Sequence, residues 1–197
     1  MDQRAKELIQ KQLEVYAFLE AYSDRGTYIL KDASGKIIEQ STFSTLYKAP
    51  TFYRFQFDSV NGASFLVWSD GKNSFLKEPG RKRPHKDREF LSSTFGISRV
   101  GTGTSFLIYL MLMKGREMLE SGGPSDKNPA VYEGERVVNG ETCYKLLLNA
   151  SGTRRYLSKE RGVWIMDERL LEDGQVEMRL LVEEYALNPE IPDSAFE

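Results

Sequence analysis

Two long parts of the chain alternate apolar and polar residues with a period of two, and short turn signals interrupt both. The first runs to about residue 78 and contains Asn61-Gly62 and Asp70-Gly71; the second follows residue 121 and contains Asn139-Gly140 and Asp173-Gly174. Such alternation is typical of half-buried strands, and Asn-Gly or Asp-Gly supplies the positive φ angles that tight hairpins need. The sequence therefore predicts two antiparallel meanders, the first with about five strands.

Two other segments have a helical pattern. Residues 3 to 22 predict an amphipathic helix that ends at SDRG, with Gly26 as its C-terminal cap. Its apolar stripe consists of Leu8, Leu13, Tyr16 and Leu19. Residues 86 to 121 predict two further helices separated by SRVGTGT. Since no repeat or long linker divides the chain, we expect a single α+β domain over residues 1–197.

Composition excludes several classes of protein. The 27 basic and 29 acidic side chains nearly cancel, to a net charge of −2, so no global charge attracts nucleic acid. The single cysteine, Cys143, excludes an internal disulfide and a multi-cysteine metal site. The longest apolar run, FLIYLMLM at residues 106 to 113, is far shorter than the ~20 residues that span a bilayer. We therefore expect no metal, no nucleic-acid partner and no membrane-spanning segment.

The segment TFYRFQFDS, residues 51 to 59, places three aromatic side chains on one side of an extended chain. If Asn61-Gly62 and Asp70-Gly71 are two-residue hairpin loops, the register pairs Phe57 with Leu66, Phe55 with Trp68 and Leu66 with Phe75. The last long strand, QVEMRLLVEEY, adds apolar side chains of its own. The predicted apolar face comprises Tyr53, Phe55, Phe57, Leu66, Trp68, Phe75, Met178 and Leu180.

This apolar face has two possible roles. The helices could cover it completely, as an ordinary core, or it could line a hollow for an apolar ligand. Aromatic and methionine side chains adapt well to irregular apolar molecules, which favours the hollow. The eight residues of the face are therefore the predicted ligand-binding residues.

The order of elements resembles that of the periplasmic lipoprotein-carrier family, the LolA-like proteins. The resemblance is carried by KAPTFYRFQFD, by VWSDGKNSF, by GERVVNGETCYKLLL and by the ending YALNPEIPDSAFE. It implies a curved antiparallel half-barrel of about ten strands with helices packed on the concave face. It also implies a hollow that accepts acyl chains, and the use of no cofactor.

Other motifs carry weaker signals. RKRPHK, residues 81 to 86, could bind an anionic headgroup, but an exposed loop is the simpler interpretation. VGTGTS lacks the third glycine of a dinucleotide fingerprint and is interpreted as a hinge or helix start. The acidic pair Asp167-Glu168 is interpreted as a solvent-facing feature, and Cys143 as an inert buried thiol.

The leading hypothesis is a non-enzymatic periplasmic carrier that shelters an acyl chain, a lipid or a lipoprotein, with a donor or acceptor protein at the membrane. The chain opens MDQRAKEL without an apolar leader, so a periplasmic location requires that a signal peptide has been removed. One alternative is an envelope-sensing regulatory or protein-interaction module that uses the same sheet. A cofactor-free enzyme that shapes an apolar substrate is the third possibility.

Overall fold

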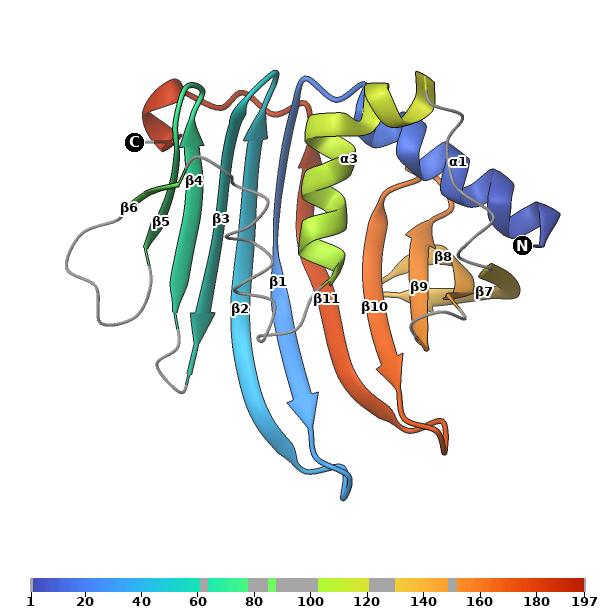
Figure 1. Ribbon diagram of the computed structural model, residues 1–197. Helices are drawn as coiled ribbons and strands as arrows, with labels where there is room; N and C mark the ends of the chain where they lie inside the picture. Colours follow the sequence, from blue (N-terminus) through green and yellow to red (C-terminus); the bar gives the residue numbers. More distant parts are fainter. Residues whose placement is uncertain are drawn as a thin grey trace.

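Eleven antiparallel strands form one open, curved sheet in the order β6-β5-β4-β3-β2-β1-β11-β10-β9-β8-β7 (Figure 1). The computed structural model describes residues 2–60, 64–77, 85–87, 103–120, 130–148 and 152–196, with side chains for all of these except 85–87 and 103–110. The predicted curved half-barrel of about ten strands is confirmed, and the described residues contain eleven strands. Hydrogen bonds between β1 and β11 join the first meander to the second.

The elements have the following bounds. The helices are α1 (Gln3–Ala17), α3 (Gly103–Glu120) and the short 3-10 helix η2 (Asp193–Phe196). The strands of the first meander are β1 (Ala21–Lys31), β2 (Ile37–Lys48), β3 (Phe52–Ser59), β4 (Phe65–Asp70), β5 (Ser74–Lys77) and β6 (His85–Asp87). Those of the second are β7 (Ala130–Val138), β8 (Glu141–Leu148), β9 (Thr153–Ser158), β10 (Trp164–Leu170) and β11 (Val176–Leu187).

Helix α1 starts where the sequence pattern places it but ends earlier. The Asp2 carboxylate caps the helix by accepting from the backbone N–H of Arg4 at 2.7 Å, and it also accepts from Tyr132 N–H of β7 at 3.0 Å. The helix ends at Ala17, so the predicted cap at Gly26 is wrong. Gly26 lies inside β1, at an irregularity in its pairing with β11.

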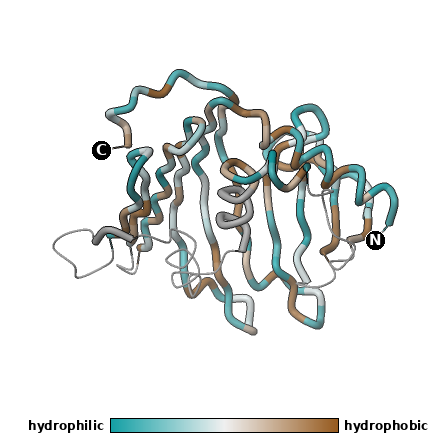
Figure 2. Tube along the Cα trace, turned by 45° about the horizontal axis from the view of Figure 1, so that its top comes forward, coloured by the Kyte–Doolittle hydropathy of each residue, from teal (hydrophilic) through white to brown (hydrophobic). Residues whose placement is uncertain are grey.

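Both helices lie on the concave face of the sheet, and α1 packs against α3 (Figure 1). Hydrophobic residues of α1 alternate with hydrophilic ones along the helix in Figure 2, as its amphipathic pattern requires. Gly115 of α3 lies so close to Ala17 that an added Cβ would be 2.9 Å from the Ala17 Cα. The two helices therefore meet backbone to backbone at this point.

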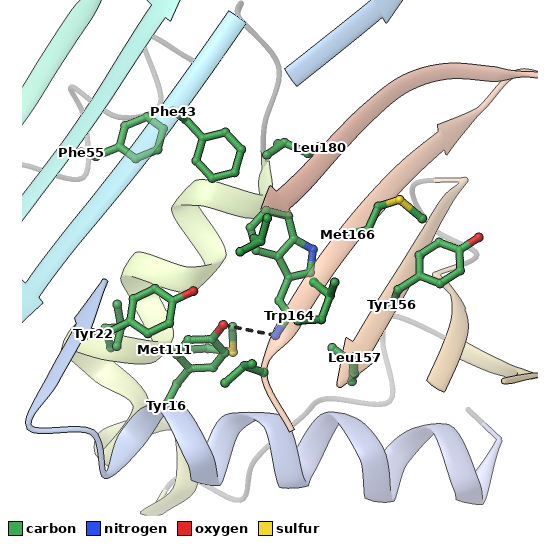
Figure 3. Packing of buried hydrophobic residues seen from close by; sticks show 14 of the residues in the cluster. Tyr16, Tyr22, Phe43, Phe55, Met111, Tyr156, Leu157, Trp164, Met166 and Leu180 are labelled. Atoms are coloured by element: carbon green, nitrogen blue, oxygen red, sulfur yellow. Dashed lines mark hydrogen bonds between the residues drawn. The ribbon is translucent and has the colours of Figure 1, made fainter. Parts of the chain in front are cut away.

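A polar network anchors α1 to the second meander. The backbone N–H of Trp164 donates to the Tyr16 hydroxyl at 3.2 Å, within the buried cluster of Figure 3. The Trp164 indole N–H donates to Asp167 at 2.9 Å, and Arg155 pairs with the same carboxylate at 2.8 and 3.1 Å. Asp167 and Glu168 are therefore buried, and the prediction that they face solvent is wrong. Their partners lie on neighbouring strands, which a linear pattern does not reveal.

Part of the predicted helical region is a strand or lies outside the described residues. His85–Asp87 forms β6 and pairs with β5, so this end of the basic segment is not a loop. Arg81, Lys82, Arg83 and Pro84 lie outside the described residues, as does the first of the two helices expected between residues 86 and 121. The second helix is α3, and it begins within the VGTGTS segment, at Gly103.

Gly26 offers a test of the sheet packing. An alanine Cβ at this position would lie 2.0 Å from the Leu181 carbonyl oxygen and 2.7 Å from the Phe43 ring, so the backbone would have to move. We expect Gly26→Ala to lower the free energy of unfolding by about 3 kcal/mol. Thr27→Ala, next in the same strand, is the control and should cost less than about 1 kcal/mol. Equal losses in urea unfolding would contradict the close packing at Gly26.

Candidate apolar ligand site

Aromatic rings cover the concave face over β1, β2 and β3. Phe43 stacks on Phe55 with ring centroids 6.5 Å apart, and Phe57 stacks on Phe65 at 5.3 Å. Tyr28 packs edge-on against Phe57 at 5.7 Å. These contacts arise because Phe43 lies opposite Phe57 in the β2–β3 ladder, which places the rings on one side of the sheet.

Five of the eight predicted ligand residues lie on this face. Tyr53, Phe55 and Phe57 are 2, 6 and 4% exposed, and they belong to the same buried cluster as the helix side chains. Leu180 faces Tyr28 across the β1–β11 ladder, and Met178 follows on the same side; both are buried. The structure thus brings these residues together on one continuous apolar surface.

The other three predicted residues lie on the opposite face. Leu66 pairs with Gln56, and Trp68 pairs with Arg54, so both side chains point to the convex side. Phe75 pairs with Trp68 and stacks on its ring at 4.9 Å. The prediction that Leu66, Trp68 and Phe75 share the face of Phe57 is wrong.

The cause is a register difference of one residue at the β3–β4 connection. Phe57 pairs with Phe65 rather than Leu66, and a shift of one residue moves every following side chain to the other face. At the β4–β5 connection the loop residues are Gly71 and Lys72 rather than Asp70 and Gly71, because the Asp70 N–H donates to the Asn73 carbonyl at 3.2 Å. The Asp70 carboxylate accepts from the backbone N–H groups of Lys72 and Asn73, so Asp70 precedes the loop. The Asn61-Gly62 turn itself lies outside the described residues.

A cleft of about 380 Å³ opens at one end of the concave face; we call it the rim cleft. It lies between the end of α1, the end of β2 and the last turns of α3. Its lining residues are Ala17, Leu19, Glu20, Tyr47, Ala49, Pro50, Leu112, Met113, Gly115, Arg116 and Glu117. Tyr47 and Leu112 also belong to the buried cluster, so the apolar floor of the cleft is continuous with the core.

Arg116 is the cation at the mouth of the rim cleft. Its Nε–H donates to the Ala17 carbonyl at 3.1 Å, and its guanidinium lies over the Phe18 ring, 5.4 Å from the centroid. The nearest carboxylate is Glu20, 4.0 Å from Nη2. Phe18 itself is 61% exposed, which is unusual for a large apolar side chain.

A second cleft, of about 610 Å³, adjoins the first and shares Glu20 and Ala49 with it. Its other wall is the segment from Asn188 to Pro192. Lys48 holds this segment in place by donating to the Ile191 carbonyl at 3.1 Å and to Asp193 at 2.5 Å. The rim of the half-barrel is therefore hollowed over two neighbouring clefts.

A carboxylate on β1, that of Asp24, is buried on the concave face. Asp24 accepts from the Tyr22 hydroxyl at 2.9 Å, and its strand neighbour on β2 is Thr45. Burial raises the pKa of Asp24 from 3.8 to about 6, while hydrogen bonds from Thr45 and Tyr22 act in the opposite direction. Burial also raises the pKa of the Tyr22 hydroxyl well above its ordinary value.

Several site residues are absent from the sequence prediction. Phe43 and Tyr47 alternate with buried Thr45 in FSTLY, so the register argument used for residues 51 to 59 would have found them. Asp24 lies in a segment interpreted as a helix stop. Arg116 becomes a site residue only through its contact with the end of α1, a tertiary contact that has no local signal.

The described residues offer little other chemistry. Cys143 is buried, as predicted, and burial raises the pKa of its thiol to about 12, which keeps it protonated. Within the part of the chain that the structure describes, no group of three or more His, Cys, Asp or Glu side chains could hold a metal ion. Neither α1 nor α3 has the length and hydropathy of a membrane-spanning helix.

The fold is shared with known structures at low sequence identity. An uncharacterized conserved protein from Thermus thermophilus matches with a TM-score of 0.64 and 11% identity, over 98% of this chain and 93% of its own. The Pseudomonas aeruginosa MucA/MucB complex matches with a TM-score of 0.50 and 13% identity, over 98% of this chain and 60% of the other. The Mycobacterium tuberculosis lipoprotein LppX matches with a TM-score of 0.50 and 14% identity, over 98% of this chain and 99% of its own.

These matches concern the fold. At 11–14% identity they show a shared fold, over 98% of this chain in each case. The chain spans about 60% of the length of MucB. No family model matches the sequence. No curated protein matches it either.

Asp24 makes stability depend on pH. Because its folded-state pKa lies above the ordinary 3.8, the folded protein binds more protons than the unfolded chain between about pH 4 and pH 6. The free energy of unfolding therefore falls as pH rises through this window, because the buried carboxylate becomes ionised. The fall is about 3 kcal/mol for a difference of two pKa units. We expect Asp24→Asn to raise the melting temperature above pH 6, and the gain to shrink toward pH 4.

Asp58→Asn is the matched control, because Asp58 is exposed on the convex face of β3. Its effect on the melting temperature should be small, because substitutions of exposed side chains usually change the free energy of unfolding by less than about 0.5 kcal/mol. A gain from Asp24→Asn that is absent at neutral pH, or that grows on acidification, would show that burial does not destabilise this carboxylate.

Proposed function

We propose that the protein is a non-enzymatic binding or carrier protein that shelters an acyl chain, a lipid or the lipid group of a lipoprotein. The ligand lies against the concave face, on Tyr53, Phe55, Phe57, Met178 and Leu180, and it enters through the rim cleft. The observation that carries this proposal is the continuity of the apolar surface. Tyr47 on the cleft floor lies opposite Tyr53, and Phe55 and Phe57 follow on the same face of β3.

The driving force is burial of apolar area, worth about 25 cal/mol per Å² removed from water. An acyl chain has no fixed shape, so a wall of aromatic rings, leucine and methionine suits it better than a set of directional hydrogen bonds. A carrier of this kind works by affinity alone and assigns no bond-making step to any residue. We place its action in the periplasm, together with a donor or acceptor protein at the membrane.

The two faces of the sheet give a direct test. We expect wild type to bind a fluorescent polyene fatty acid saturably, and Phe57→Ala to weaken binding at least about fivefold because Phe57 contributes wall area. Trp68→Ala removes a ring of comparable size from the convex face and should change the affinity by less than about twofold.

Thermal melting of each variant accompanies the titration, since a packed Phe→Ala change costs about 3–5 kcal/mol. If Phe57→Ala does not fold, Phe57→Leu replaces it. Absence of saturable binding in wild type, or equal losses in the Phe57 and Trp68 variants, would contradict the proposal.

A regulatory or protein-interaction role is the second candidate. It is favoured by one observation, namely that the similar MucB fold occurs in a complex with another protein, MucA. In this role the clefts at the rim would receive a segment of a partner protein. Native mass spectrometry of freshly purified protein separates the two candidates: a mass increase matching a lipid supports the carrier, and a stable protein partner without lipid supports the regulator.

A further inference from the structure

The rim cleft combines an apolar floor with a charged mouth. Tyr47, Leu112 and Met113 form the floor, whereas Glu20 and Arg116 flank the opening. Amphipathic molecules fit such a site, since the chain contacts the floor and the head stays at the mouth beside water. The charges at the mouth therefore decide which headgroup is accepted.

Among the residues that the structure describes, few partners use the donors of the Arg116 guanidinium. The guanidinium is fixed by its Nε–H bond to the Ala17 carbonyl and by the Phe18 ring beneath it. The Glu20 carboxylate lies 4.0 Å from Nη2, which is beyond hydrogen-bond distance. A guanidinium with a free edge binds carboxylate and phosphate groups through two parallel N–H bonds.

The acidic residues near Arg116 do not satisfy it. Glu117, which also lines the cleft, accepts from Lys114 at 3.0 and 3.3 Å. At the second cleft, Lys48 is engaged by Asp193 and the Ile191 carbonyl. Arg116 is therefore the cation of the rim cleft that a ligand can reach, and Glu20 is its competitor.

We infer that Arg116 recognises the anionic headgroup, a carboxylate or a phosphate, of an acyl ligand whose chain enters along Tyr47 and Leu112. This inference rests on the proposed acyl-binding function and specifies its ligand. Glu20 lowers the affinity for such a headgroup by competing for the guanidinium. The protein then prefers alkyl acids or alkyl phosphates to neutral lipids of the same chain length.

The test compares three ligands with one alkyl chain: palmitate, the matching alkyl phosphate and the matching alcohol. Each displaces a fluorescent acyl probe from wild type and from Arg116→Gln, Arg116→Lys, Glu20→Gln and Lys36→Gln. We expect Arg116→Gln to weaken the two anionic ligands about five- to tenfold and to leave the alcohol within about twofold. Arg116→Lys should retain part of the preference, because it keeps the charge but loses the bidentate geometry.

Glu20→Gln has the opposite expected sign, because it should strengthen anionic binding about two- to threefold. Lys36→Gln is the control, because Lys36 is exposed in the β1–β2 hairpin, lines neither cleft, and loses the same positive charge; it should change nothing. If Arg116→Gln weakens palmitate more than the alkyl phosphate, the natural headgroup is a carboxylate. If it weakens the alkyl phosphate more, the headgroup is a phosphate.

The failures are distinguishable. If wild type binds none of the three molecules, the proposed function falls and this inference falls with it. If wild type binds all three, and Arg116→Gln weakens acid and alcohol equally, only the headgroup inference is overturned. Arg116 would then act solely by capping the Ala17 carbonyl and holding the end of α1.

Discussion

An open sheet with one aromatic face is stable only if something covers that face, and the rest of this structure follows from that requirement. In a closed barrel, the inward-facing side chains of opposite walls would cover one another. Here α1 and α3 provide the cover, and they contact each other backbone to backbone at Ala17 and Gly115. The position of these two helices therefore controls access to the concave face.

Different contacts hold the two helices that cover the concave face. Helix α1 is anchored at its first residue by Asp2, which binds β7, and near its end by the Tyr16 hydroxyl, which accepts from Trp164. A buried polar group such as the Tyr16 hydroxyl is costly unless paired, so its bond with Trp164 favours one position of the helix. Helix α3 is held by the close approach to Ala17, by the bond from Arg116 to the Ala17 carbonyl, and by the packing of Leu112 in the buried cluster. The rim cleft lies where these contacts meet.

Much of the fold was predictable because periodicity is a local property. Period-two alternation located both meanders, and the heptad-like spacing around Leu8 and Tyr16 located α1. Register was not predictable to the last residue, because it depends on which residue of a turn signal enters the loop. A difference of one residue places Trp68 on the convex face, where it stacks on Phe75 instead of joining the rings of the concave face.

The residues of the candidate site also divide into those with a local sequence pattern and those without one. Phe55 and Phe57 were found because they alternate within a single strand, and no loop intervenes between them. Arg116 was missed because its role comes from Ala17, a partner distant in sequence, and Asp24 was missed because its segment was interpreted as a helix stop rather than a strand. The pair Asp167-Glu168 shows the same limit, since its burial depends on arginines of other strands.

The central claim is that the concave aromatic face receives the ligand, and the chain carries its own reporters. It has two tryptophans, Trp164 on the concave face beside Phe43 and Trp68 on the convex face. The measurement is tryptophan quenching by a brominated fatty acid in wild type and in Trp68→Phe. A chain bound on the concave face quenches Trp164, so the quenched fraction should rise when Trp68 is removed. A quenched fraction that falls in Trp68→Phe would place the ligand on the convex face and contradict the account.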